Sequence, residues 1–152
     1  MTSPTRPVAQ PAHLGWRLLA IVYDALPIVA LWFVVSVTVL IVRGGSPVIP
    51  WSLAFWLQCA ALWAVTGVYT VASWRNGGQT MGMRPWRLRV VDEQGDTADL
   101  PALIRRYLWA TPAILLGGLG LLALLVDRER RALHDRLSAT RMVRTEAVPR
   151  RG

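Results

Sequence analysis

Three long apolar blocks dominate the pattern of the sequence. Residues 18–42 contain one charged side chain, Asp24, and residues 51–73 and 107–126 contain none. A helix needs about 20 apolar residues to cross the hydrocarbon core of a bilayer. Too little polar sequence remains to cover such blocks in a soluble domain of 152 residues. The pattern therefore predicts three membrane-embedded helical segments at these positions.

The third block, residues 107–126, is interrupted by Pro112, Gly117, Gly118 and Gly120. Such breaks suit a bent helix that enters the membrane and returns, provided that protein covers the freed backbone groups. Its length of 20 residues is also enough for one plain span. The apolar pattern leaves both forms open.

The distribution of basic residues predicts the topology. All 17 are arginines, against 9 acids. Two lie before the first block, one lies in residues 43–50, six lie in residues 74–106 and eight follow residue 126. The positive-inside rule places the N-terminus and the middle loop in the cytoplasm and residues 43–50 outside, so the first two blocks form an antiparallel hairpin. The eight C-terminal arginines favour a returning third segment.

Two short runs have the pattern of strands. In residues 87–91 and 140–144, polar and apolar side chains alternate or β-branched side chains are common. The two runs can pair at the membrane surface if both lie on the same side of the membrane. Residues 1–12 and 145–152 are expected to be a disordered tail and a basic tail. The predicted fold is an all-α membrane domain over residues 13–144, with a helical hairpin, a third embedded segment and a short two-stranded β element.

Composition adds two exclusions. The single cysteine, Cys59, excludes a disulfide scaffold. A net charge of +8 is compatible with nucleic acid or with an anionic membrane surface. The arginines fringe the apolar blocks rather than forming a recognition surface, which excludes nucleic acid. The expected partners are the bilayer and its anionic lipid headgroups.

Asp24 is the most informative single residue. It lies seven positions after Arg17, about 10 Å deeper on the same helix face. An unpaired carboxylate at that depth costs several kcal/mol, so it must be protonated, hydrated or paired. The candidate cations are Arg17, Arg105 and Arg106. Asp24 is then either a proton- or ion-handling carboxylate or a buried ion pair that fixes helix packing.

The second block carries a packing signal. Ala60, Ala64 and Gly67 share one helix face, and small residues let helices approach closely. Gln58 is a lone polar side chain in this block and is expected to hydrogen-bond a neighbouring helix. These residues indicate helix packing rather than a ligand site.

Catalytic and metal signatures are absent from the sequence. There is no phosphate-binding loop, serine elbow or zinc-protease motif. The glycine-rich residues 77–83 read as a structured turn, and residues 127–137 read as a charged interfacial helix. His134 and Asp135 are adjacent and point about 100° apart on a helix, which does not suit a metal pair. We therefore expect no enzyme activity, no metal and no cofactor.

The chain resembles the RDD family of small bacterial membrane proteins, which is named for one arginine and two aspartates. Gly15–Asp24 is similar to the opening helix of the family, with an Arg at its start and an Asp inside. Gly78–Arg84 and Leu88–Asp92 resemble its G-[KQ]-T-x-G-M loop and the strand after it. Arg131–Thr140 resembles its closing R-x-L-H-D-x-x-x-x-T signature, with Ser-Ala where Ala-Gly is usual.

The resemblance assigns candidate functional residues. The family's arginine and aspartates map onto Arg17, Asp24 and Asp135, and Asp127 is a rival for the second aspartate. The supporting candidates are Arg105, Arg106, Asp127, His134, Gln79 and Thr80.

The resemblance implies an inner-membrane, multi-pass protein with a role in transport, including cation–proton exchange. An intramembrane carboxylate that gains or loses a proton is what proton coupling requires. Two spans and a bent segment are few for a pathway within one chain, so a transporter is expected to be a homo-oligomer. The alternative is an accessory or assembly protein in which the Arg and Asp residues are packing ion pairs.

Overall fold

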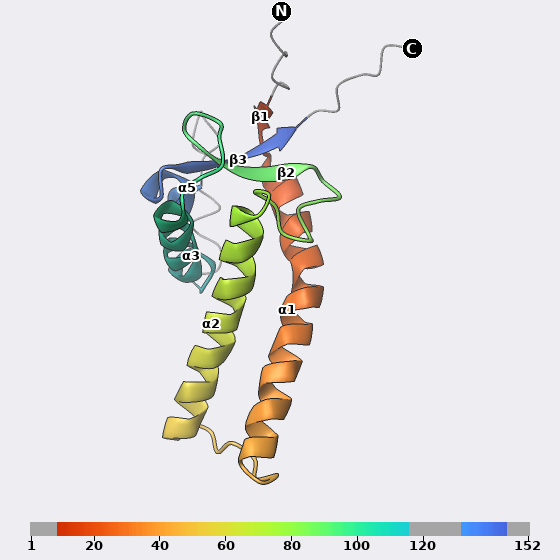
Figure 1. The fold of residues 1–152 in the computed structure, drawn as a ribbon, viewed down its shortest axis with the longest axis vertical. Helices are drawn as coiled ribbons and strands as arrows, with labels where there is room; N and C mark the ends of the chain where they lie inside the picture. The colour runs from red at the N-terminus through yellow and green to blue at the C-terminus, as the bar shows by residue number, and fades with distance from the viewer. Residues whose placement is uncertain (1–8, 116–131, 146–152) are drawn as a thin grey trace, which may run out of the picture.

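The computed structural model describes residues 9–115 and 132–145 and shows a long helical hairpin with a small sheet at one end (Figure 1). The elements are β1 (Ala9–Pro11), α1 (Leu14–Val42), α2 (Leu53–Arg75), β2 (Leu88–Asp92), α3 (Leu100–Leu115), α5 (Leu133–Leu137) and β3 (Thr140–Thr145). Helix α3 packs beside α2, and α5 lies next to α3 under the sheet. The arrangement matches the predicted hairpin. The three strands, α3 and α5 together form a second part of the fold at one end of the hairpin, which we call the cap.

Polar contacts join the two long helices. The Trp32 indole donates to the Thr66 hydroxyl at 2.9 Å, and the Gln58 amide donates to the Ser36 hydroxyl at 3.2 Å. The predicted interhelical hydrogen bond of Gln58 is therefore confirmed. Such bonds fix the register of helices that lack a hydrophobic driving force between them in lipid.

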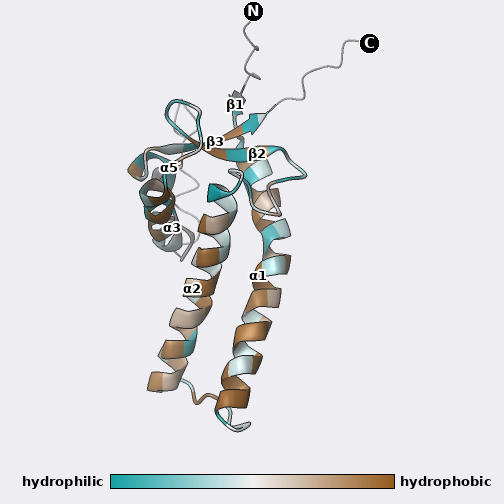
Figure 2. Cartoon of the chain, in the orientation of Figure 1, coloured by the Kyte–Doolittle hydropathy of each residue, from teal (hydrophilic) through white to brown (hydrophobic). Residues whose placement is uncertain are grey.

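Hydrophobic residues occupy most of the length of the two long helices (Figure 2). The most apolar stretches of α1 and α2 have mean hydropathies of 2.7 and 1.4, and many of their large apolar side chains are exposed. Val22, Phe33 and Leu57 are each more than 60% exposed. A soluble protein does not present such a continuous apolar surface to water. Both helices are long and apolar enough to cross a membrane.

The third apolar block differs from its expected bounds. Helix α3 begins at Leu100, seven residues before the block, and its described part ends at Leu115. Residues 116–126 lie outside the described residues. The two candidate spans within the described ranges are α1 and α2, and α3 is not one of them.

The sheet joins three distant parts of the chain in the order β1-β3-β2. Strand β3 pairs antiparallel with β2, from Leu88 opposite Arg144 to Asp92 opposite Thr140. This confirms the predicted pairing of the two short runs. Ala9–Pro11 form a third strand, β1, against the other edge of β3. The predicted N-terminal tail is corrected at this point, because backbone pairing orders residues that have no apolar periodicity.

A small core lies between the sheet and the starts of α1 and α3. Leu88, Val90 and Leu103 are almost fully buried in it, and Trp16 and Trp86 pack against its side at a ring-centroid distance of 5.1 Å. On β2, Arg89 points outward between the two buried residues. The sheet is thus half-buried, as the alternation in its sequence requires.

All three strands lie at one end of the hairpin (Figure 1). A third segment that crossed the membrane plainly would leave β3 at the far end of α1. That helix has 29 residues and is therefore about 40 Å long. The pairing of β3 with β1 and β2 places the described C-terminal strand at the same end of the hairpin as the start of α1, and residues 116–131 between α3 and α5 lie outside the described residues.

This topology predicts the labelling pattern of introduced cysteines. With Cys59 replaced by Ala, Gln94→Cys and Arg144→Cys should react with an impermeant maleimide from one side of sealed vesicles, because both positions are exposed at the sheet end. Ser46→Cys, in the connection at the other end of the hairpin, should react from the opposite side. Labelling of Arg144→Cys and Ser46→Cys from the same side would contradict the fold.

Candidate functional site

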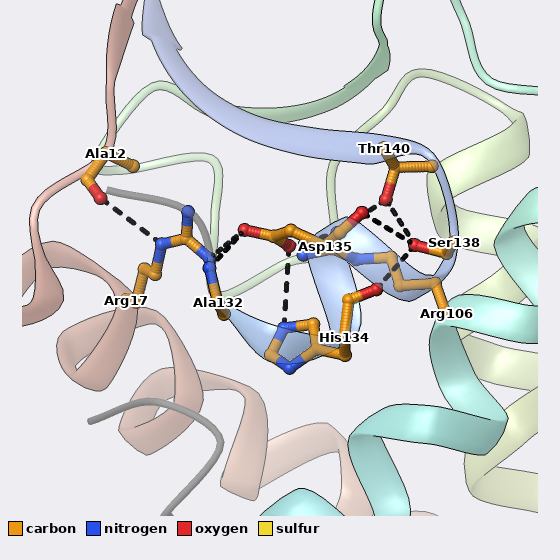
Figure 3. A network of polar contacts seen from close by, with 8 residues as sticks. All are labelled: Ala12, Arg17, Arg106, Ala132, His134, Asp135, Ser138 and Thr140. Carbon is orange, nitrogen blue, oxygen red and sulfur yellow. Dashed lines mark hydrogen bonds and ion pairs between the residues drawn. The ribbon is translucent and has the colours of Figure 1, made fainter. Parts of the chain in front are cut away.

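The Asp135 carboxylate lies between two guanidinium groups in the core of the cap (Figure 3). Arg17 Nη1 donates to Asp135 Oδ2 at 2.7 Å, and Arg106 Nη1 donates to Asp135 Oδ1. The three residues are at most 3% exposed. They come from α1, α3 and α5, so one carboxylate connects three helices that are far apart in the sequence.

Hydrogen bonds extend this cluster into the backbone and the sheet. Asp135 Oδ2 accepts from the Ala132 amide at 3.1 Å, which caps the start of α5. Arg106 Nη1 also donates to the Thr140 hydroxyl at 2.8 Å on β3, and Arg17 Nε donates to the Ala12 carbonyl at 3.2 Å. The cluster therefore links the segment after β1, α1, α3, α5 and β3.

The electrostatics of the cluster are dominated by burial and by opposite charge. Burial alone would raise the pKa of Asp135, but the Arg106 and Arg17 guanidiniums outweigh it and hold the pKa at about 2. Asp135 is therefore ionised at neutral pH. Removing one partner of a buried ion pair leaves an uncompensated charge, which costs about 3–5 kcal/mol. The arrangement makes Asp135 a structural counter-ion for both arginines.

His134 is a neutral member of the same cluster. Its Nε2 lies 3.5 Å from Asp135 Oδ1. Burial and the Arg106 guanidinium lower the pKa of His134 from 6.5 to about 4, against a partial rise caused by Asp135. The two adjacent side chains thus contact each other, whereas the sequence predicted that they diverge. Within the described residues, no group of three metal-ligating side chains comes together.

Asp24 is held by hydroxyl and amide donors. Its Oδ1 accepts from the Tyr69 hydroxyl at 3.0 Å and from the Gly82 amide at 2.9 Å, and its Oδ2 accepts from the Thr80 hydroxyl. The predicted cation partners are wrong for this residue, because Arg17 and Arg106 are bound to Asp135 instead.

Asp24 anchors the loop that leaves α2. Gly82 lies so close to α1 that an added Cβ would stand 2.6 Å from the Asp24 backbone nitrogen and would collide with the Ala20 carbonyl oxygen. Gln79 Nε2 donates to the Leu88 carbonyl at 2.7 Å, which connects the same loop to β2. The predicted structured turn is thus confirmed, and its function is to join Asp24 to the sheet.

A cavity of about 300 Å³ lies between the three long helices and the cluster. Asp24, Arg106 and His134 all line it, so the cavity extends from the hydrogen-bonded Asp24 site to the Asp135 cluster. The lining includes five residues of α2 and α3 that carry a hydroxyl group, namely Thr66, Tyr69, Thr70, Tyr107 and Thr111. The three residues that resemble the family's arginine and aspartates therefore belong to one connected region.

The remaining candidate residues lie in different places. Thr80 and Gln79 lie in the anchored loop, and Arg105 is exposed beside the buried Arg106. Asp127 lies outside the described residues. The predicted interfacial helix is corrected over its described part, because Asp135 is fully buried within the protein rather than facing lipid or water.

Three functional contacts were not predicted from the sequence. No sequence pattern distinguishes Tyr69 from its apolar neighbours, although its hydroxyl donates a hydrogen bond to Asp24. Thr140 appears in the closing motif, and its contact with Arg106 explains why a hydroxyl residue stands there. Gly82 appears in the loop motif, where its close approach to α1 leaves no room for a side chain.

Gly82→Ala should destabilise the protein by about 1–3 kcal/mol, because the new methyl group meets backbone atoms that have no room to move. Gly77→Ala is the matched control in the same loop, since an added Cβ there meets nothing within 4 Å. The measurement is thermal unfolding of each variant in detergent. Equal midpoints for the two variants would show that the loop does not pack tightly on α1.

Acidification should lower the stability of the folded protein through protonation of His134. Between pH 6.5 and about 4 the unfolded chain binds a proton at this position that the folded protein does not, so stability falls as the pH falls. Asp135 contributes mainly below this range, because its unfolded pKa of about 3.9 lies at the lower end. His134→Gln should flatten the profile of unfolding midpoint against pH relative to the wild type, and His13→Gln, at an exposed position, should not. Identical profiles for wild type and His134→Gln would refute the buried, neutral imidazole.

Comparison with known proteins identifies a family for the chain. The sequence profile of the RDD family matches residues 11–139, a range that contains Arg17, Asp24 and Asp135. Searches of curated proteins and of solved structures give no match. The family match and the two apolar helices together indicate a membrane protein. The resemblance seen in the sequence is thus confirmed, and the chain belongs to the RDD family.

Proposed function

We propose that the protein is a membrane transport protein that couples cation movement to protonation of Asp24, and that it works as a homo-oligomer in the inner membrane. The observation that carries this proposal is the position of Asp24. Its carboxylate lies on a helix long and apolar enough to span a membrane, and it lines a cavity of about 300 Å³. Carboxylates within spans mark ion and proton pathways in membrane proteins.

The hydrogen bonds of Asp24 provide a means of coupling. An ionised carboxylate only accepts hydrogen bonds, and here it accepts three. Protonation turns one acceptor site into a donor, so the contacts with Tyr69, Thr80 and Gly82 cannot all persist unchanged. Because Thr80 and Gly82 belong to the loop after α2, the protonation state of Asp24 is linked to the position of that loop.

The oxygen atoms around Asp24 suit a hard cation. Thr70 and Tyr69 add hydroxyl oxygens to the carboxylate along the cavity wall. Carboxylate and hydroxyl oxygens, together with water, are ligands that hard cations accept. A cation that displaces the proton from Asp24 would restore the ionised form of the carboxylate, which is the exchange that a cation–proton antiporter performs.

An accessory or assembly protein is the second candidate, and the Asp135 cluster favours it. Its charges are buried and bonded to one another, so they hold the cap together without needing a ligand. The cytoplasmic face predicted from charge carries exposed arginines, including Arg84, Arg87 and Arg89. Each such residue contributes about 1 kcal/mol to the attraction for an anionic leaflet. A scaffold of this kind would use Asp24 only to fix the loop.

Asp24→Asn separates the two candidates, because asparagine keeps the size of the side chain and one acceptor oxygen but has no titrating proton. Transport predicts that purified Asp24→Asn protein in vesicles loses proton-coupled flux of Na⁺ or K⁺ to the background level. A proton-sensitive dye inside the vesicles measures the flux after each cation is added.

Asp96→Asn is the matched control, since Asp96 is an exposed acid outside the cavity. It should retain the wild-type flux. A correctly assembled Asp24→Asn protein with normal flux would refute the transport proposal. Two results together would favour the scaffold. The wild-type protein would show no flux, and the Asp24→Asn variant would have a lower unfolding midpoint or fail to form its complex.

A further inference from the structure

Near the Asp135 cluster, three residues that line the cavity carry buried polar atoms with no hydrogen-bond partner in the described parts of the protein. They are the indole Nε1 of Trp74, Nε of Arg106 and Nδ1 of His134. The three residues are 7%, 1% and 7% exposed, and all of them line the cavity. A buried polar group without a partner costs about 1–3 kcal/mol. Three such groups on one cavity indicate a place built for a polar ligand.

The chemistry of these atoms specifies the polar part of that ligand. Trp74 Nε1 and Arg106 Nε can only donate hydrogen bonds. The Arg106 guanidinium lies 5.2 Å from the Trp74 ring centre, so the two donors are neighbours. A donor on a guanidinium binds most strongly to an anionic oxygen. His134 directs Nε2 towards Asp135 (Figure 3), and its Nδ1 has no hydrogen-bond partner in the described parts of the protein.

The rest of the cavity specifies an apolar body. Ile21, Ile28, Met83 and Ala110 contribute to its wall. Ile21 is also 46% exposed on the apolar surface of α1, so the cavity reaches the face of the hairpin that meets lipid. The Asp24 oxygens, which line the same cavity, already accept three hydrogen bonds and do not compete for the free donors.

We infer that this cavity binds a single-chain acyl amphiphile from the bilayer, whose oxyanion head group accepts hydrogen bonds from Trp74 and Arg106 while its chain lies along the apolar wall. The head group is a carboxylate or a phosphate, which share the required acceptor oxygens. This site is distinct in chemistry from the proposed cation site at Asp24, and its occupancy does not depend on transport.

The test is binding of radiolabelled palmitate to the purified full-length protein in a non-ionic detergent, with competition by other palmitoyl or hexadecyl compounds. Palmitate tests the carboxylate, and palmitoyl lysophosphatidate tests the phosphate. At least one of them should bind, and the tighter of the two identifies the head group. Neutral palmitoylglycerol should compete more weakly, and hexadecylamine, whose ammonium has no acceptor, should not compete.

Two pairs of variants locate the site. Trp74→Phe keeps the ring over which Arg106 lies but removes the N–H, and it should weaken binding roughly threefold to tenfold. Trp86→Phe is its control, because the Trp86 indole N–H is also buried and unpartnered among the described residues but does not line the cavity. Ala110→Phe should fill the cavity and abolish binding, whereas Leu108→Phe, at an exposed position of the same helix, should not.

Several outcomes would overturn the inference. They are no binding by either anionic probe, equal competition by hexadecylamine, and equal affinities in the Trp74→Phe and Trp86→Phe variants. Retained binding in Ala110→Phe would do the same, since it would place the amphiphile on the outer surface of the hairpin. Palmitate binding by the wild-type protein is measured without any ion gradient, so a failure of the transport proposal leaves this result unaffected.

Discussion

The fold of this RDD protein depends on one buried carboxylate placed between two buried guanidiniums. Asp135 binds Arg17 at the start of α1 and Arg106 in the middle of α3. Neither arginine could be buried alone, because an unpaired charge in a low-dielectric interior is too costly. The residues before α1, the third helix and the C-terminal strand are therefore held at one end of the hairpin. The three-stranded sheet and the core beneath it follow from this constraint.

Asp24, which lies seven residues after Arg17 on α1, also holds distant parts of the chain together. It attaches the loop after α2 to the face of α1, and Gln79 attaches the same loop to β2. The cap and the hairpin are thus connected through hydrogen bonds as well as through the small apolar core. A chain that exposes most of its apolar side chains on the hairpin has few left for such a core, and polar contacts supplement it.

The cavity follows from the same arrangement. Two charged or polar sites hold the helices at fixed positions, and the space between them is lined by both. One end presents a carboxylate with three hydrogen bonds, and the other presents donors that have no partner in the described parts of the protein. The two proposals, cation exchange at Asp24 and amphiphile binding near Trp74, use these different ends. They describe one cavity with two kinds of chemistry.

The sequence by itself determined the hairpin, the pairing of β2 with β3 and the turn after α2, and it selected Arg17, Asp24 and Asp135 as candidates. Apolar length and strand alternation are local properties, and the motifs contain the candidate residues directly. It did not determine which acid meets which base. Arg17 and Arg106 were among the candidate partners of Asp24, but both meet Asp135, and Asp24 meets Tyr69 and a glycine-rich loop. Such pairings depend on how helices distant in sequence are placed by packing, and no local pattern encodes that placement.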